Sequence, residues 1–214
     1  MPSSSAEAVS FDEQGVRGFL HPQPPGADDG LVLTHGAGGN CNAPLLVAAA
    51  KAFHAAGLVV LRCDLPFRWE RRGPPSPGGA AADRAGLKKA VDALRAIVPR
   101  HVYLGGHSYG GRQASMLAAD QPKLAEALLL LSYPLHPPGK PTQLRIAHFP
   151  SLTTRAVFVH GSTDPFGSLA EMSAALDLIP SEKELIVVEG AGHDLKRGRF
   201  DLNKLVDALL RSRQ

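Results

Sequence analysis

The sequence predicts an α/β fold: a doubly wound, mostly parallel sheet flanked by helices. Six short apolar segments recur along its 214 residues. They are continuously apolar rather than alternating, which is typical of strands buried on both faces. Segments with helical spacing lie between them, and this alternation favours parallel strands joined by crossover helices. The six expected strands are 31–33, 58–61, 102–104, 128–131, 157–159 and 185–188.

The remaining elements follow in chain order. Residues 16–20 are expected to add an antiparallel edge strand, followed by a proline-rich connection over 21–30. Apolar residues three and four apart predict helices over 87–98 and 200–210. The long connections 66–79 and 133–154 are too short to form a separate lid. We therefore expect a single domain over 1–214 without a cap, with residues 1–12 flexible.

Composition excludes several classes of protein. A formal net charge of +3 gives little support for a nucleic-acid partner. There is no apolar run of about 18 residues for a membrane span, and residues 1–7 lack the basic and apolar parts of a secretory signal. Cys41 and Cys63 lack metal-ligand spacing and suggest reduced, partly buried thiols. A cytoplasmic protein that acts on a small molecule is the expectation.

The strongest motif follows the third expected strand. Gly106-His107-Ser108-Tyr109-Gly110 matches G-x-S-x-G, the sharp strand-to-helix turn that projects a nucleophilic serine above a sheet. The alternative is a glycine-rich turn selected only for close packing. Its position between an apolar strand and an alanine-rich segment favours the catalytic interpretation, with Ser108 as the nucleophile.

A serine hydroxyl needs a base, and the base needs an acid that orients it. His193 follows the last expected strand, in Gly190-Ala191-Gly192-His193, and is the expected base. Asp164 follows the preceding strand and is the expected acid, which gives the chain order serine, acid, histidine. Asp194 is the rival acid, but its adjacency to His193 makes a side-chain bond between the two awkward.

The same site needs amide donors for an oxyanion. The backbone N–H of Tyr109, directly after the nucleophile, is the first candidate. The second is the N–H of Ala37, in the glycine-rich loop after the first expected strand, where Asn40 or Asn42 is expected to cap the next helix. A dinucleotide-binding interpretation of that loop fails, because Cys41 stands where the third glycine of G-x-G-x-x-G belongs.

Other residues are assigned from their positions beside these loops. His107 and His160 are expected to be structural, and His21, His54, His101 and His148 are expected to be surface or satisfied histidines. The expected walls of the substrate pocket are the 66–79 connection, Tyr133, Leu135, His136 and Phe166. Arg68, Arg71 and Arg72 are candidates for a clamp on a substrate carboxylate, against the alternative of a solvated basic loop.

Taken together, the glycine-rich loop, the serine elbow, His160-Gly161-Ser162-Thr163-Asp164 and Gly190-Ala191-Gly192-His193-Asp194 resemble an alpha/beta hydrolase of the small kind without a cap. More narrowly, Leu131 to Pro138 is similar to the group of testis-expressed protein thirty and the third subunit of the NSL complex, near dienelactone-hydrolase-like enzymes. Dienelactone hydrolases use a cysteine nucleophile, from which Ser108 departs.

The sequence and the resemblance together imply a cytoplasmic serine hydrolase that cleaves small esters or thioesters through an acyl-enzyme. No cofactor and no metal are expected. Because some relatives act as scaffolds, the alternative is a catalytically silent binding module that has kept the fold. Retention of Ser108, Asp164 and His193 favours the enzyme.

Overall fold

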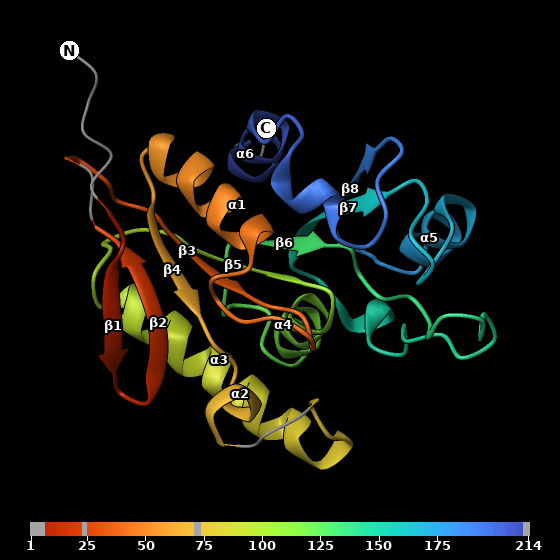
Figure 1. The fold of residues 1–214 in the computed structure, drawn as a ribbon, viewed down its shortest axis with the longest axis horizontal. Coiled ribbons are helices and arrows are strands. Elements are labelled where there is room, and N and C mark those ends of the chain that lie inside the picture. The colour runs from red at the N-terminus through yellow and green to blue at the C-terminus, as the bar shows by residue number, and fades with distance from the viewer. Residues whose placement is uncertain (1–6, 23–24, 71–73, 212–214) are drawn as a thin grey trace.

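The computed structural model describes residues 7–22, 25–70 and 74–211, with only the backbone of Pro77. Within these residues eight strands form one sheet in the order β1-β2-β4-β3-β5-β6-β7-β8 (Figure 1). All neighbouring pairs from β4 to β8 are parallel, whereas β2 pairs antiparallel with both β1 and β4. The bounds are β1 Val9–Glu13, β2 Val16–His21, β3 Gly30–Thr34, β4 Val59–Cys63, β5 Val102–His107, β6 Ala127–Leu131, β7 Arg155–Gly161 and β8 Lys183–Val188. The predicted fold class is confirmed.

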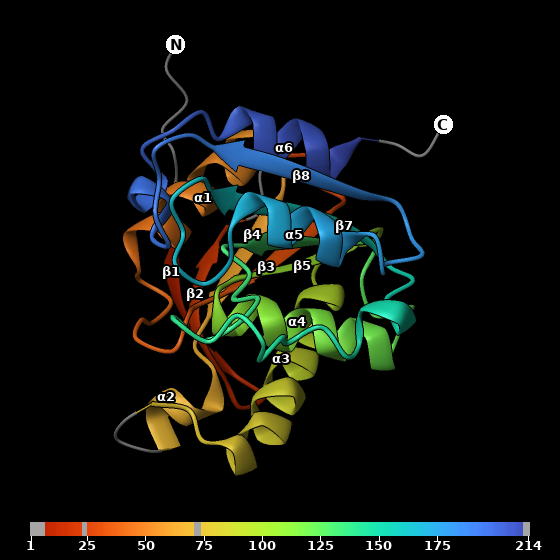
Figure 2. The same ribbon diagram turned by 90° about the vertical axis from the view of Figure 1, so that its right-hand side faces the viewer.

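Helices cover both faces of this sheet. One face carries α1 (Pro44–Ala55) and α6 (Asn203–Leu210), and the other carries α3 (Ala80–Arg95), α4 (Tyr109–Asp120) and α5 (Leu169–Leu176) (Figures 1 and 2). Short helical turns complete the fold: α2 (Pro66–Glu70), η1 (Pro77–Gly79), η2 (Phe149–Ser151) and η3 (Leu195–Gly198). The two faces form two apolar cores separated by the strands, as expected when strands are buried on both sides.

Alternate residues of one central strand reach the two cores. Leu31 and Leu33 of β3 pack with Leu46 of α1, and Val32 between them packs with Leu94 of α3. All of these side chains are fully buried. Burial of a leucine side chain contributes about 1.5–3 kcal/mol, so the pattern strongly determines which face each helix covers.

The N-terminal edge differs from the prediction. The expected strand 16–20 is β2 and is antiparallel, but β1 covers it and forms the edge of the sheet. Residues 9–12, within the segment expected to be flexible, therefore belong to the sheet. Gln14 and Gly15 both have positive φ, 55° and 75°, and form the two-residue hairpin that joins the strands. Phe11 anchors β1 in the core.

The other elements lie close to their predicted positions. Each of the six expected strands overlaps one of β3 to β8. The helix expected over 87–98 begins earlier, at Ala80, because part of the proline-rich connection 66–79 forms α2 and η1 and ends where the helix starts. Cys41 and Cys63 are both buried and unpaired.

The topology brings four loops to one edge of the sheet. β3, β5, β7 and β8 run in the same direction, so the segments that follow Thr34, His107, Gly161 and Val188 begin at the same end. This is the edge at which open parallel sheets place their sites. No helix in the described ranges has the length and apolar character needed to cross a membrane.

Candidate active site

Ser108 occupies a strained turn between β5 and α4. Its φ of 51° and ψ of −116° lie outside the regions that non-glycine residues normally adopt, at a cost of about 1–3 kcal/mol. A Cβ at Gly106 would lie 2.7 Å from the carbonyl carbon of Gly110. A Cβ at Gly110 would lie 2.5 Å from the carbonyl oxygen of His35. The two glycines of the motif are therefore required by close approach of the backbone.

The three residues expected to act together are joined by hydrogen bonds. His193 Nε2 lies 2.8 Å from Ser108 Oγ, and His193 Nδ1 lies 2.8 Å and 3.1 Å from the two carboxylate oxygens of Asp164. A carboxylate only accepts, so the proton on Nδ1 donates to Asp164. Nε2 is then free to accept the Ser108 hydroxyl proton. Loops after β5, β7 and β8 supply one member each.

The carboxylate of Asp164 is held in its ionised form. Its side chain is fully buried, whereas 22% of the His193 side chain is exposed. Burial acts to raise the pKa of Asp164, but the hydrogen bond and charge of His193, with the Phe166 N–H at 2.9 Å, outweigh burial and lower it. The buried carboxylate accepts at Nδ1 and so fixes the imidazole with Nε2 toward Ser108.

The loop after β3 brings Ala37 to the same place. The loop is fixed by His35, whose Nδ1–H donates to the Gly36 carbonyl and whose Nε2 accepts from the Leu65 N–H. Arg68 also holds it, since its Nη2 donates to the carbonyl oxygen of Ala37 at 2.7 Å. Asn40 and Asn42 do not cap α1, which begins after Ala43; Asn40 Oδ1 instead accepts from the Asn42 N–H.

A cavity of about 1040 Å³ opens in front of Ser108. Both expected oxyanion residues, Ala37 and Tyr109, line it, and neither backbone N–H donates to a backbone or side-chain acceptor among the described residues. Tyr109 is the first residue of α4, where the helix dipole favours negative charge. Phe166 lines the cavity as expected, and its ring stacks on His193 with centroids 4.1 Å apart.

Four other expected wall residues do not line this cavity, so the prediction for their side chains is wrong. Tyr133 and Leu135 are buried in the core, because the chain after β6 turns inward before it reaches the surface. His136 is also buried, and its Nδ1 bonds to the Pro137 carbonyl. Arg68 turns toward Ala37, as described above, rather than into the cavity. Arg71 and Arg72 lie outside the described residues.

Comparison with known proteins agrees with the fold. The family described as "Alpha/beta hydrolase domain" matches residues 27–210. The chain belongs to the alpha/beta hydrolase family.

Solved structures have the same fold as this alpha/beta hydrolase. A dienelactone hydrolase from Anabaena variabilis is 24% identical, with a TM-score of 0.72 over 94% of this chain and 93% of that one. An alpha-beta serine hydrolase homologue from Coxiella burnetii is 19% identical, with a TM-score of 0.71 over 99% of both chains. A lidless serine hydrolase from Xanthomonas campestris is 16% identical, with a TM-score of 0.69 over 100% of this chain and 99% of that one. At these identities the likeness shows the fold.

Two features of the hydrolase site were missed from the sequence. Arg84, Arg112 and Arg145 line the cavity. Arg112 lies four residues after Ser108 on α4, so helical spacing could have found it. The second feature is the contact of His107, which was expected to be structural, with the backbone of His193 at 2.8 Å.

Asp194 and His160 take no part in the hydrogen-bonded path from Ser108 to Asp164, although His160 Nδ1 lies 4.0 Å from a carboxylate oxygen of Asp164. Asp194 is mostly exposed and accepts from the Lys196 N–H, so it does not compete with Asp164. His160 is buried, and its Nε2–H donates to the Gly167 carbonyl at 2.8 Å. This bond holds the loop that carries Asp164 and Phe166.

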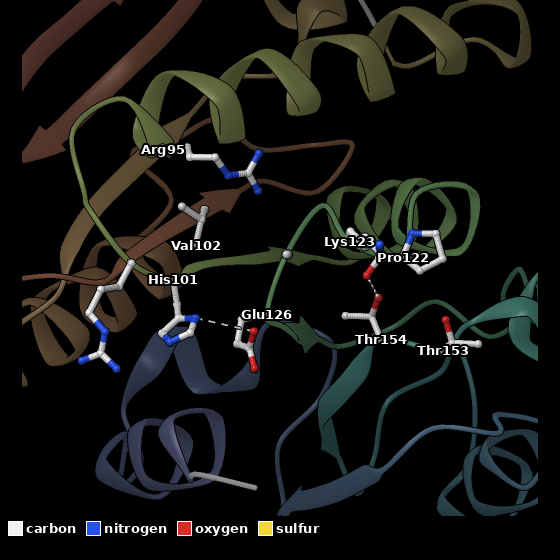
Figure 3. A pocket seen from close by; sticks show the side chains of 10 residues that line it. Arg95, His101, Val102, Pro122, Lys123, Glu126, Thr153 and Thr154 are labelled. Atoms are coloured by element: carbon white, nitrogen blue, oxygen red, sulfur yellow. Dashed lines mark hydrogen bonds and ion pairs between the residues drawn. The ribbon is translucent and has the colours of Figure 1, made fainter.

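A second hollow of about 390 Å³ lies at the opposite edge of the sheet, where β5, β6 and β7 begin (Figure 3). Its polar side chains mostly pair with their neighbours. His101 faces Glu126 at 3.6 Å, and the Thr154 hydroxyl donates to the Pro122 carbonyl. No serine or cysteine is among its described lining residues, and we assign it no role in catalysis.

Proposed function

We propose that this alpha/beta hydrolase is a serine hydrolase that cleaves small esters or thioesters through an acyl-enzyme. The observation that carries the proposal is the continuous hydrogen-bonded path from Ser108 Oγ through His193 to the buried Asp164, at the mouth of a cavity large enough for a small substrate. Each group in the path has the hydrogen-bonding partner that its role requires.

In the first half-reaction Ser108 Oγ attacks the carbonyl carbon of the substrate. His193 Nε2 takes the hydroxyl proton as the new carbon–oxygen bond forms. The carbonyl oxygen becomes an oxyanion, which accepts hydrogen bonds from the N–H groups of Ala37 and Tyr109. One such donor is typically worth about 2.7–4 kcal/mol of barrier.

The tetrahedral intermediate then collapses. The alcohol or thiol leaves with the proton from His193, and the acyl group remains esterified to Ser108. Water attacks this ester with His193 again as the base, the carboxylic acid is released, and Ser108 recovers its proton. In both halves Asp164 stabilises the transient imidazolium and maintains the tautomer that leaves Nε2 available.

Turnover of p-nitrophenyl acetate and butyrate tests the proposal. We expect Ser108→Ala and His193→Ala to lower kcat by roughly 10⁴ to 10⁶ while circular dichroism shows a folded chain. Asp164→Asn should also lower kcat, because Nδ1 loses its carboxylate partner. Asp194→Asn is the matched control, since Asp194 is adjacent to the base but does not contact its ring. If Ser108→Ala lowered kcat by less than about tenfold, the nucleophile would be another residue. If the folded wild type did not turn over either ester, the alternative of a binding module would be favoured.

A further inference from the structure

The cavity beside Ser108 has a cationic wall, formed by Arg84 of α3, Arg112 of α4 and Arg145 of the connection after β6. Resting on the proposed function, we propose that this cationic wall binds an anionic group of the substrate. The substrate class is then a small ester or thioester whose acyl part carries a carboxylate or a phosphate-like group at its far end.

The cationic wall begins one helical turn from the nucleophile. The N–H of Arg112 donates to the Ser108 carbonyl at 2.9 Å, so Arg112 lies one helical turn after Ser108, which is the N-cap of α4. Met116, four residues further on, also lines the cavity. Four residues of helix rise roughly 6 Å, which places the arginine at the reach of an acyl chain of a few carbons.

The positive charges of the wall have no carboxylate partner among the described residues. None of the ion pairs there includes these three arginines. Arg84 donates to the neutral side-chain oxygen of Gln113 at 2.9 Å, and Arg112 Nε is buried without a hydrogen-bond partner. The nearby carboxylate of Asp83 is occupied by the Phe67 N–H and the Tyr109 hydroxyl.

Two of the guanidinium groups also repel each other. Burial lowers the pKa of Arg145, and the charge of Arg112 lowers it further. Like charges brought together in a partly buried place are costly unless an anion lies between them. A guanidinium group presents paired donors that match a carboxylate or phosphate, so a bound anion would satisfy both the charge and the free donors.

Buried residues hold Arg145 in place. Its N–H donates to the Leu135 carbonyl at 2.8 Å, and its own carbonyl accepts from the Tyr133 hydroxyl. The Tyr133 ring packs against Phe149, with centroids 5.3 Å apart. Tyr133 and Leu135, which do not line the cavity themselves, therefore fix the backbone that presents an arginine to it. Such pre-organisation reduces the entropic cost of binding.

Much of the remaining cavity wall is apolar. Its apolar lining includes Ala37, Ala43, Met116, Pro134 and Phe166. A hydrocarbon segment can lie along these side chains while its charged end reaches the cationic wall. This arrangement distinguishes an anionic acyl group from a neutral acyl group of the same length.

The test compares three p-nitrophenyl esters that share a four-carbon acyl segment: the butyrate, in which the segment ends in a methyl group, the glutarate half-ester, in which it carries a terminal carboxylate, and the analogue in which it carries a terminal phosphonate. For the wild type we expect kcat/KM at least about tenfold higher for an anionic ester than for the butyrate, with most of the difference in KM. Arg112→Gln and Arg145→Gln should reduce this ratio to near one. Preference between the glutarate and the phosphonate identifies the anion.

Arg211→Gln, at the exposed end of α6, is the matched control for the two arginine variants. It should keep the wild-type ratio of kcat/KM values.

A binding measurement on a variant that cannot form the acyl-enzyme distinguishes failure of this inference from failure of the proposed function. Ser108→Ala is titrated calorimetrically with monomethyl glutarate and with methyl butyrate. Saturable binding of the glutarate alone, lost when Arg112→Gln is added, supports the cationic wall whether or not esters are hydrolysed. Hydrolysis of all three esters at equal rates overturns the inference and leaves the hydrolase intact, and absence of glutarate binding overturns the inference in either case.

Discussion

The Nε2 nitrogen of His107 lies 2.8 Å from the carbonyl oxygen of His193, 86 residues away in the chain. Burial lowers the pKa of His107 to about 4, so the ring is neutral at pH 7. A carbonyl only accepts, and therefore Nε2 of the neutral ring carries the proton and donates it. The residue before the nucleophile thus holds the backbone of the expected base.

Replacement of His107 tests this positioning role. We expect His107→Leu to lower kcat by about tenfold and to change KM less, because the base moves relative to Ser108 while the other residues that line the cavity stay in place. His107→Gln, which keeps an N–H donor, should recover most of the loss. Steady-state kinetics on p-nitrophenyl butyrate measures both. Equal losses in the two variants would mean that the side chain acts through its volume and not through its hydrogen bond.

The elbow glycine Gly106 provides a test of packing. Gly106→Ala should lower the free energy of unfolding by about 2–4 kcal/mol, because the added Cβ meets backbone atoms of Gly110 and Gly111 at 2.7 Å. Gly38→Ala is the control, since no described atom lies within 4 Å of its Cβ position. Urea unfolding measures the two variants. Equal stability of Gly106→Ala and Gly38→Ala would contradict the close approach.

The buried His21 predicts how stability depends on pH. Burial, with the charge of Arg62, lowers the pKa of His21 from 6.5 to about 4, and His21 Nε2 accepts from Arg62 Nε at 3.2 Å. A group whose pKa is lower in the folded state takes up its proton more readily when unfolded, so its contribution is complete above pH 6.5 and is lost as the pH falls toward 4. Between pH 7 and 5 this loss is about 2 kcal/mol.

His21→Gln keeps an acceptor for Arg62 but does not titrate. We expect its free energy of unfolding to fall less than that of the wild type between pH 7 and 5, by about 1–2 kcal/mol. Urea unfolding at the two pH values gives the comparison. An equal change in the free energy of unfolding between pH 7 and 5 for the two proteins would show that the fold does not hold His21 neutral.

Much of the fold and the Ser108–His193–Asp164 path follows from sequence because both depend on position relative to strands. Continuous apolar segments identify β3 to β8, and a residue in the first part of a loop after a parallel strand lies at the carboxyl edge of the sheet. Ser108, Asp164 and His193 all obey this rule. Their convergence therefore needs only the order of the strands.

Apart from Phe166 and residues 74–76, the walls of the cavity could not be predicted in the same way. Their positions depend on the path of the long connections, where Tyr133 turns into the core and Arg145 turns out of it. Hydrogen bonds to distant backbone groups decide this path, as at Arg68 and Ala37. β1 was missed because Gln14-Gly15 is a weaker hairpin signal than Asn-Gly or Asp-Gly.

Labelling of the nucleophile tests the central claim most directly. The wild-type protein is treated with a fluorophosphonate, and intact-mass and peptide mass spectrometry locate the adduct. We expect a single adduct on the peptide that contains Ser108, its loss in Ser108→Ala, and much slower formation in His193→Ala. A folded wild-type protein that remains unmodified, or an adduct at another residue, would contradict the account.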